Sequence, residues 1–414
     1  MRVLQGRAAE RAVVRLESRA SRLEAAETAV GRIVRSVRAG GDKALARHAT
    51  LWDGLQQGEA LRVSPGEIEQ GWKTTPAETR EALKRAAENI RRFARWQAPR
   101  TWRKKISGGE LGQVVRPLRS VGCYVPGGRY PLPSTLLMTA IPAQVAGVER
   151  IVVVSPKPQA ATLAAAYLLG ISEAYRCGGA QAIAALAYGT ETIARVDKIV
   201  GPGNAYVTAA KKLVSFDCAI DMLAGPTEAV VYSENGNAEF LAADLVAQAE
   251  HDPDAVVVFV STSEKLAKSV VSSARGVAKG NRIAQKAARH GGYALVAASR
   301  AQAVEWVNRI APEHLTVDED ADVSAIRNAG SVFVGDYSPQ SAGDYAAGPN
   351  HVLPTAGAAR FRGGLSVADF VKVITVQKFV REGLREIAPV VTTLAEAEGL
   401  RAHAESVRVR CGDA

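Results

Sequence analysis

Cysteine is scarce in this 414-residue chain, and its four cysteines form no Cys-x-x-Cys pair. They lie far apart, at Cys123, Cys177, Cys218 and Cys411. This spacing excludes a disulfide scaffold and a thiolate zinc site. No apolar run reaches the ~20 residues that a membrane helix needs, because Pro142 and Gln144 interrupt the nearest one, at 136–148. The first residues become charged too early for a signal peptide, so we expect a cytoplasmic protein.

Negative charge is in deficit, since 52 Lys and Arg residues face 42 Asp and Glu residues, a net charge of +10. The densest basic segment, 91–105, also contains Phe93, Trp96 and Trp102. Such a mixture can contact phosphates and stack on bases. We favour a helix end with a buried aromatic face and a solvated basic face, and we expect no nucleic-acid partner. A diffuse positive charge could also serve an anionic cofactor.

The length suits two or more domains, and the order of apolar patterns indicates the fold class. Segments 8–20, 22–38 and about 77–97 have helical spacing, the last behind a capping box at Thr75-Pro76-Ala77-Glu78. From Gly122 onward, short β-branched runs alternate with helical segments. The predicted strands are 151–155, 198–200, 229–232, 255–260, 293–296 and 331–334, and the predicted helices are 160–169, 205–214, 238–250, 263–274, 300–310 and 394–409. This alternation predicts two α/β domains with mostly parallel sheets.

Histidine is also scarce, with six in the chain. His48 and His290 stand among basic residues in helical patterns, and we expect them at the surface. Gln248 and His251 are three residues apart at a helix end, so they share one face and could ligate one divalent ion. A solvated helix face is the simpler interpretation of that pair in isolation.

Two further segments carry candidate chemistry. Glu313 and His314 follow Pro312, which ends the preceding helix, so an adjacent carboxylate and imidazole could handle successive proton transfers. An exposed loop is the alternative. Segment 341–355 contains Asp344 and His351 and is predicted to be a long irregular loop, either functional or a surface connection.

Three segments remain open from spacing alone. Glu398 and His403 are five residues apart, a poor spacing for one helical face, so either Gly399 breaks the last helix or the two groups reach different parts of a site. The glycine-rich turns at 122–128 and 201–204 precede helices and could bind phosphate through backbone N–H groups. Neither completes a G-x-G-x-x-G fingerprint, and tight turns are the simpler interpretation.

Taken together, these segments resemble the histidinol dehydrogenase family over nearly the whole chain. The resemblance rests on seven motifs that occur in order: G-C-Y-V-P-G-G-R at 122–129, G-G-A-Q-A-I-A-A-L-A-Y-G-T at 178–190, V-D-K-I-V-G-P-G-N-A-Y-V at 196–207, D-M-L-A-G-P-T-E at 221–228, A-Q-A-E-H-D-P-D at 247–254, A-P-E-H-L at 311–315 and G-D-Y-A-A-G-P-N-H-V-L-P-T at 343–355. The N-terminal hundred residues are less diagnostic.

The resemblance implies an intertwined homodimer of α/β subunits, each with two incomplete Rossmann-like domains and small helical terminal parts. The implied division is an N-terminal helical arm at 1–20, a discontinuous first α/β domain at 21–121 and 228–366, a second, NAD-binding domain at 122–227, and a C-terminal helical domain at 367–414 that contacts the partner subunit.

The family oxidises L-histidinol to L-histidine through L-histidinaldehyde, the last steps of L-histidine biosynthesis, with two NAD and one zinc per site. The resemblance places zinc ligands on Gln248, His251, Asp344 and His403, the last from the other subunit, and these residues also surround the substrate. It places the acid–base pair on Glu313 and His314, NAD contacts on Tyr124, Gln181 and Asn204, and further substrate contacts on Thr227, His351 and Glu398. Many members carry serine where this chain has Thr227, but the hydroxyl is kept.

Two alternatives stay open at this level. A paralogue in the same superfamily could oxidise another polar alcohol, such as a sulfonated diol, although the presence of His351 and Glu398 favours histidinol. A nucleic-acid-binding protein would account for the basic charge but would leave the histidine clusters unexplained.

Overall fold

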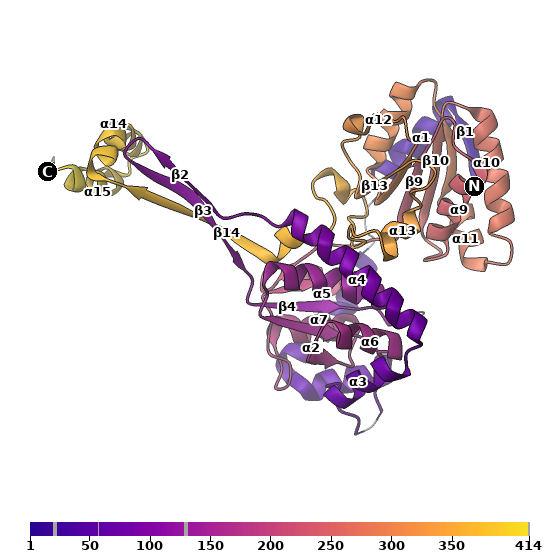
Figure 1. Ribbon diagram of the computed structural model, residues 1–414, viewed down its shortest axis with the longest axis horizontal. Coiled ribbons are helices and arrows are strands. Elements are labelled where there is room, and N and C mark those ends of the chain that lie inside the picture. The colour runs from indigo at the N-terminus through magenta and orange to yellow at the C-terminus, as the bar shows by residue number, and fades with distance from the viewer. Residues whose placement is uncertain (20–22, 57, 128–130, 413–414) are drawn as a thin grey trace.

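The structure is a computed structural model that describes residues 1–19, 23–56, 58–127, 131–412. These residues form two α/β units and a smaller unit that projects from them (Figure 1). Both α/β units are built on parallel sheets, which confirms the predicted fold class. None of the helices in the described ranges is long and apolar enough to cross a membrane.

The first α/β unit contains a five-stranded parallel sheet. Its strands in spatial order are β6 (Glu173–Tyr175), β5 (Arg150–Val154), β4 (Ser120–Tyr124), β7 (Lys198–Val200) and β8 (Ala219–Ile220). One face packs on α2 (Glu24–His48), α7 (Gly179–Tyr188) and α8 (Ala205–Val214), and the other on α3 (Pro65–Thr74), α4 (Ala77–Gln97), α5 (Pro133–Ala146) and α6 (Ala160–Leu168). Successive residues of a strand point to opposite faces. Val152 and Val154 therefore enter one core and Val153 the other.

The second unit contains a six-stranded parallel sheet. Its strands in spatial order are β1 (Arg2–Gln5), β11 (Gly292–Val296), β10 (Val256–Ser261), β9 (Glu228–Tyr232), β12 (His314–Val317) and β13 (Ser331–Val334). One face packs on α9 (Ala238–Ala249), α10 (Glu264–Val277) and α11 (Arg282–His290), and the other on α1 (Gly6–Glu17) and α12 (Arg300–Ile310). The helix α13 (Gln340–Tyr345) follows β13 and contacts α9 and β12.

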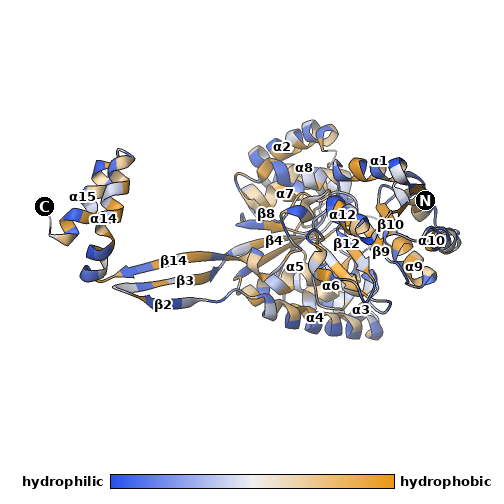
Figure 2. Ribbon diagram, turned by 90° about the horizontal axis from the view of Figure 1, so that it is seen from above, coloured by the Kyte–Doolittle hydropathy of each residue, from blue (hydrophilic) through white to orange (hydrophobic). Residues whose placement is uncertain are grey.

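The third unit projects from the body as an antiparallel ribbon with two helices at its end (Figures 1 and 2). The ribbon contains β2 (Trp102–Ile106), β3 (Gly109–Pro117) and β14 (Val371–Phe379), and the helices are α14 (Arg381–Ala397) and α15 (Arg401–Cys411). Every residue of β2 is exposed. The short elements elsewhere are η1 (Ala49–Asp53), η2 (Val323–Ala325), η3 (Ala358–Arg360) and η4 (Val367–Phe370).

Two local sequence predictions are wrong. The residue before α4 is Pro76, and no side chain caps this helix, whereas a complete capping box forms at Ser64 and Glu67 of α3. The predicted final helix at 394–409 is two helices. They are separated at Gly399, which confirms the alternative that this residue breaks the helix, and its φ of 76° lies in the left-handed region that glycine tolerates.

The N-terminal segments are distributed differently from the predicted division. Residues 2–5 form the edge strand β1 of the six-stranded sheet, so the predicted arm at 1–20 is part of that unit. Helices α2, α3 and α4 cover the five-stranded sheet rather than joining 228–366, because their apolar faces complete its two cores. The predicted boundary at 20 and 21 lies outside the described residues.

Candidate active site

The candidate site lies where the two α/β units meet. In the six-stranded sheet, the contributing residues stand at the amino ends of β9 and β12. In the five-stranded sheet, the facing element is the start of α5, which follows the carboxyl end of β4. A hydrogen-bond distance of 3.4 Å joins Thr135 Oγ1 of α5 to His351 Nε2. Segments far apart in the sequence therefore converge at this junction.

His314 is the first residue of β12 and is 3% exposed. Its ring stacks on Phe333 with 5.9 Å between centroids. Nε2 lies 3.0 Å from Asp344 Oδ1, and Nδ1 lies 3.7 Å from Glu313 Oε2. Burial lowers the pKa of His314, but the Glu313 and Asp344 carboxylates outweigh it and raise this pKa to about 10. Among the described residues, Nδ1 has no hydrogen-bond partner.

Asp344 joins three of the predicted residues. Besides its contact with His314, its Oδ2 accepts a 2.9 Å hydrogen bond from Gln248 Nε2, and its carbonyl oxygen accepts one of 2.6 Å from His351 Nδ1. Burial raises the pKa of Asp344, but the bond and charge of His314 dominate and hold it below its usual range. Helix α13 can approach Phe333 because residue 343 is glycine, where an added Cβ would lie 2.6 Å from the ring.

Glu313 is held by the main chain of β9. Its Oε2 accepts a 3.0 Å hydrogen bond from the N–H of Glu228, the residue that follows Thr227. The Glu228 side chain is buried and pairs with Arg19 of the N-terminal segment at 2.5 Å. Burial raises the pKa of Glu228 against the lowering effect of Arg19. This arrangement fixes one oxygen of Glu313 and leaves the side chain beside His314, so the predicted exposed loop is excluded.

His351 is half-buried, and its surroundings define its proton positions. The carbonyl of Asp344 can only accept, so Nδ1 of His351 carries a hydrogen and Nε2 can accept from Thr135. Burial lowers the pKa of His351, although Asp344 acts in the opposite direction. A neutral ring thus bridges the two units.

The residues predicted to hold zinc are only partly assembled within one chain. Gln248 and Asp344 are in direct contact, and the exposed His251 lies one turn beyond Gln248, to whose carbonyl its N–H donates at 3.3 Å. Glu398 directly follows α14 and His403 lies in α15, and both residues are exposed. These two helices lie at the end of the projecting unit, far from the two α/β units (Figure 1). No group of three or more His, Cys, Asp or Glu residues able to hold a metal occurs within the described ranges.

The predicted NAD contacts lie at the carboxyl edge of the five-stranded sheet. The strand order places β4 between β5 and β7, so successive strands are added on one side of β4 first and then on the other. Ligands bind in open parallel sheets at the point where the strand order reverses in this way. Tyr124 ends β4, and Asn204 caps α8 just after β7. Gln181 of α7 is near, because Gly179 N–H donates to the Tyr124 hydroxyl at 3.1 Å. Gly128 and Arg129 of the first glycine-rich turn lie outside the described residues.

A buried ion pair braces the second glycine-rich turn. Lys211 Nζ lies 2.6 Å from Asp221 Oδ1, and both side chains are buried. Asp221 accepts from the N–H of Gly201 at 2.7 Å, while Lys211 donates to the Gly201 carbonyl at 2.5 Å. Gly201 has a φ of 115°, and a Cβ would lie 2.2 Å from the Tyr124 carbonyl oxygen. This turn is thus built to lie against the end of β4.

Several residues of this arrangement were missed at the level of sequence. Asp53 accepts from Gln181 Nε2 at 2.8 Å and from the Gly178 N–H at 2.9 Å, and nothing in its sequence neighbourhood signals that role. Glu228 falls inside a quoted motif, but its pairing with Arg19 depends on tertiary structure. Two other predictions concern exposure. His48 is buried against Trp52 rather than at the surface, whereas His290 is exposed as predicted.

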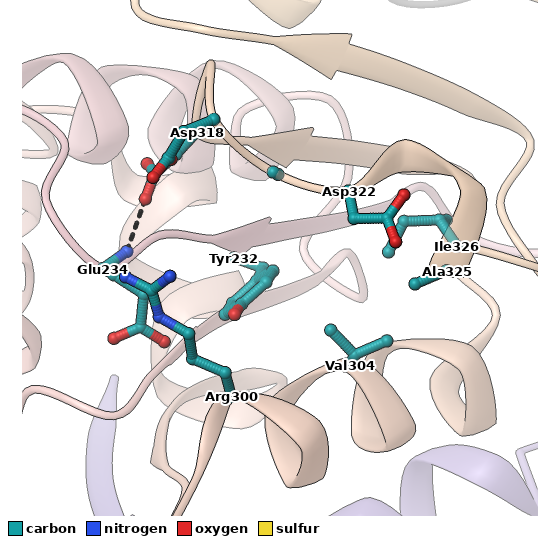
Figure 3. A pocket seen from close by; sticks show the side chains of 10 residues that line it. Tyr232, Glu234, Arg300, Val304, Asp318, Asp322, Ala325 and Ile326 are labelled. Carbon is teal, nitrogen blue, oxygen red and sulfur yellow. Dashed lines mark hydrogen bonds between the residues drawn. The ribbon is translucent and has the colours of Figure 1, made fainter.

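A separate cavity of about 220 Å³ lies at the other, carboxyl edge of the six-stranded sheet (Figure 3). Tyr232 and Arg300 line it, and the Glu234 N–H donates to Asp318 Oδ2 at 2.7 Å beside it. None of the predicted site residues lines this cavity.

The basic aromatic segment also differs from its prediction. Trp96 is 73% exposed and Trp102 is 45% exposed, so the aromatic face is not buried within one chain. The reason is positional, since α4 ends where the projecting ribbon begins and the body does not cover it.

Comparison with known proteins gives a consistent result. The family model described as histidinol dehydrogenase matches residues 16–411. A histidinol dehydrogenase of Methanothermobacter thermautotrophicus is 48% identical over 398 residues, 93% of each chain. One of Vibrio vulnificus is 46% identical over 92% of this chain and 91% of its own. The crystal structure of histidinol dehydrogenase from Elizabethkingia anophelis superposes with a TM-score of 0.92 at 36% identity, covering 99% of this chain and 98% of its own.

Proposed function

Because this chain belongs to the histidinol dehydrogenase family, we propose that it catalyses the zinc- and NAD-dependent four-electron oxidation of L-histidinol to L-histidine through L-histidinaldehyde. The chain is an oxidoreductase, and its membership of this family supports histidinol oxidation in histidine biosynthesis. The proposal includes a cytoplasmic location, which the scarcity of cysteine supports. It includes no nucleic-acid partner.

The observation that carries the proposal is the buried acid–base pair at the junction of the two units. Glu313 and His314 lie within 3.7 Å of each other, and Asp344 orients the imidazole from its other nitrogen. A positioned base whose ring orientation is fixed by a carboxylate is the arrangement that general-base catalysis needs. No other region of the described chain combines these groups.

The first step removes hydrogen from the alcohol. Nε2–H of His314 donates to Asp344, which leaves the lone pair of Nδ1 to accept the hydroxyl proton while a hydride leaves the same carbon. NAD, when bound, supplies the hydride acceptor in each of the two oxidations. The enzyme then holds the aldehyde and a protonated His314.

The second step needs a nucleophilic water. Glu313 is anchored through the Glu228 N–H, so its carboxylate is positioned beside His314 to remove a proton from water that attacks the aldehyde. As the water adds, protonated His314 returns its proton to the aldehyde oxygen and becomes a free base again, and Glu313 releases the proton of the water to solvent. The hydrate then loses its second hydride, and His314 accepts the hydroxyl proton of the hydrate. The neutral ring of His351 and the carboxylate of Glu398 are assigned to substrate binding, with Glu398 gripping the substrate imidazole.

The donor set fits zinc in chemical type, because an amide oxygen, a carboxylate and two imidazoles are ligands that zinc accepts. We assign the ligands to Gln248, His251, Asp344 and the His403 of a second chain. When bound, the cation orients the amino alcohol and offsets the charge of Asp344, which brings the pKa of His314 down toward the range of a general base.

In a homodimer with a shared site, the partner subunit supplies the residues that lie far from the site within one chain. The projecting unit exposes apolar side chains that a partner could cover, and these are Val373, Ile374, Val380, Val390, Leu394, Leu400 and Val409. A small unit that exposes this many apolar side chains is typical of a protein interface. The same unit carries Glu398 and His403, so docking on a second copy would deliver both to a site.

The test of the proposal is the yield of NADH per histidinol consumed, before and after chelation. We expect two equivalents that disappear with a chelator and return with zinc. A yield of one, or turnover unaffected by complete metal removal, contradicts the proposal. Equal or faster oxidation of a sulfonated diol would favour the paralogue instead.

The shared site has its own test. Mixing His403→Ala protomers with Gln248→Ala protomers creates dimers in which one of the two sites is intact, so partial activity should return. The control is each variant alone, which should stay inactive. Failure to complement when subunit exchange is demonstrated by differently tagged chains would exclude sharing through His403.

A further inference from the structure

A buried hydrogen-bonded cluster lies behind the candidate site and connects the three elements that carry it. The cluster consists of Asp244 on α9, Thr316 on β12 and Gln340 at the start of α13. The Thr316 hydroxyl donates to Asp244 Oδ2 at 3.2 Å and accepts from Gln340 Nε2 at 3.0 Å. Thr316 is 4% exposed, Gln340 is fully buried and Asp244 is half-buried, so water has little access to the bonds of the Thr316 hydroxyl.

Each member of the cluster lies close in sequence to a site residue. Asp244 precedes Gln248 by four residues in α9 and so shares its helix face. Thr316 is two residues beyond His314 in β12, and therefore points to the same side of the sheet. Gln340 lies four residues before Asp344 in α13. The cluster therefore repeats, one layer deeper, the Gln248–Asp344–His314 contacts of the site.

Helix α13 depends on this cluster for its position. The residue before it is Pro339, which provides no side-chain cap, although the first N–H groups of a helix need acceptors. The start of α13 is held instead by the Gln340 side chain, whose Nε2 donates to the Thr316 hydroxyl at 3.0 Å. Since α13 has only six residues, this link through Thr316 to Asp244 of α9 fixes most of the helix.

The pKa of Asp244 indicates that its carboxylate is costly to bury but is kept as a hydrogen-bond acceptor. Burial raises its pKa to about 6, while the hydrogen bonds from Thr316 and Gln340 lower it. Such a group is costly to bury, and a purely structural position would be filled more cheaply by an apolar residue.

We propose that Asp244 is a positioning residue, which through Thr316 and Gln340 sets the relative placement of Gln248, His314 and Asp344 for metal binding and proton transfer. This inference rests on the proposed function. It assigns to Asp244 no contact with substrate or cofactor.

The experiment compares Asp244→Ala, Asp244→Asn and Thr316→Val with the wild-type protein, all as full-length chains. Zinc affinity of the metal-stripped protein is measured by equilibrium titration, and kcat and KM for histidinol are measured at saturating zinc. Loss of an outer-layer partner typically weakens metal binding by about 10- to 100-fold, and we expect that range for Asp244→Ala. Misplacement of the acid–base groups should also lower kcat at least about tenfold, with a smaller change in KM.

A matched control is Asp322→Ala in the same unit. Asp322 also accepts from a backbone N–H and a hydroxyl, both of Ser324, at 3.0 and 2.6 Å, but it is exposed and remote from the site. It should leave zinc affinity and kcat unchanged. Asp244→Asn keeps one acceptor oxygen and should lie between wild type and Asp244→Ala.

Wild-type zinc affinity and kcat in folded Asp244→Ala would overturn the inference. If Asp244→Ala does not fold, the same measurements are made on Asp244→Asn and Thr316→Val. Unchanged zinc affinity and kcat in both of these variants would also overturn the inference. Absence of histidinol oxidation by the wild-type protein would instead refute the proposed function, so the two failures are distinguishable.

Discussion

The two α/β units share one architecture but present opposite edges to the same junction. The five-stranded unit presents the carboxyl end of β4, where ligands bind in parallel sheets. The six-stranded unit presents the amino ends of β9 and β12, with Glu313 and His314. At the first edge the polar side chains are held by the fold itself, as Lys211 and Asp221 are. At the second edge, Nδ1 of His314 has no hydrogen-bond partner among the described residues.

This difference indicates that the two edges have different roles. Most polar groups described at the five-stranded edge are satisfied, with the buried Ser155 Oγ as an exception, and they make a rigid, shaped surface suited to holding a cofactor. The unsatisfied imidazole at the six-stranded edge is costly for stability and is expected only where chemistry needs it. Five experiments can break or sharpen this distinction.

The largest effect is expected at the six-stranded edge. His314→Asn removes the base and should lower kcat by about 10²- to 10⁴-fold, while zinc stays bound and the free energy of unfolding does not fall. Steady-state NADH production and metal analysis provide the measurements. Near-normal turnover would show that the chemistry is not carried by this edge.

At the five-stranded edge, Lys211→Met should act on stability first. It leaves Asp221 buried without its partner, which typically costs about 3–5 kcal/mol. Denaturant unfolding measures this loss. A large loss of kcat in protein that remains folded would contradict a purely scaffolding role.

Glu313→Gln separates the two half-reactions. The amide keeps an oxygen for the Glu228 N–H but cannot take a proton from water, so oxidation of supplied histidinaldehyde should fall by about 10²-fold or more, with little change in histidinol binding. Stopped-flow measurement of each half-reaction provides the comparison. Equal losses in both would argue against a role in activating water.

A smaller effect is expected for Tyr124→Phe, which removes the acceptor of the Gly179 N–H. The cost should be about 1 kcal/mol of stability and a modest weakening of NAD binding, because the start of α7 loses one anchor. Thermal unfolding and cofactor titration measure both. Unchanged NAD affinity would show that Tyr124 does not contribute to NAD binding.

The smallest expected effect is the pH dependence of stability, whose sign differs between the two units. Burial, and then the charge of Arg47, lowers the pKa of His48 in the five-stranded unit. The unfolded chain therefore takes up this proton first, and stability falls as the pH drops below about 6.5. Burial raises the pKa of Asp244 in the six-stranded unit to about 6. The folded chain takes up that proton first, so stability rises as the pH falls from 6 toward the ordinary aspartate value.

Thermal unfolding of metal-free His48→Gln and Asp244→Asn between pH 7 and 5 checks both signs. Relative to wild type, the first variant should gain stability as the pH falls and the second should lose it. Parallel curves for all three proteins would show that neither group contributes.

Regular elements with strong local patterns were predictable. The helix at 300–310 and the strand at 331–334 have the predicted bounds, because helical periodicity and β-branched runs are local signals. The bounds of the final helix were wrong, because the apolar spacing continues across Gly399, and only the spacing of Glu398 and His403 suggested the break there as an alternative. The strand at 314–317 was also missed, because only the neighbouring strands β9 and β13 make this short segment a strand.

The candidate residues around Gln248, Glu313, Asp344 and His351 were nominated by residue type and by a family resemblance, and the structure brings these four into one connected cluster. The roles of individual residues, and the source of His403, stay predictions. Asp244 could have been suspected from its spacing to Gln248, which places both on one helix face. Asp53 and Arg19 could not, because their partners lie more than a hundred residues away.

By itself, the sequence determined the α/β class, most of the regular elements and a short set of chemically able side chains, because backbone periodicity and residue chemistry are encoded locally. Only the tertiary structure decided that the carboxyl edge of one sheet would face the amino edge of the other. It also decided which imidazole nitrogen would be left without a partner and that the last two helices would project away. These outcomes depend on packing between segments distant along the chain, and no local pattern specifies that packing.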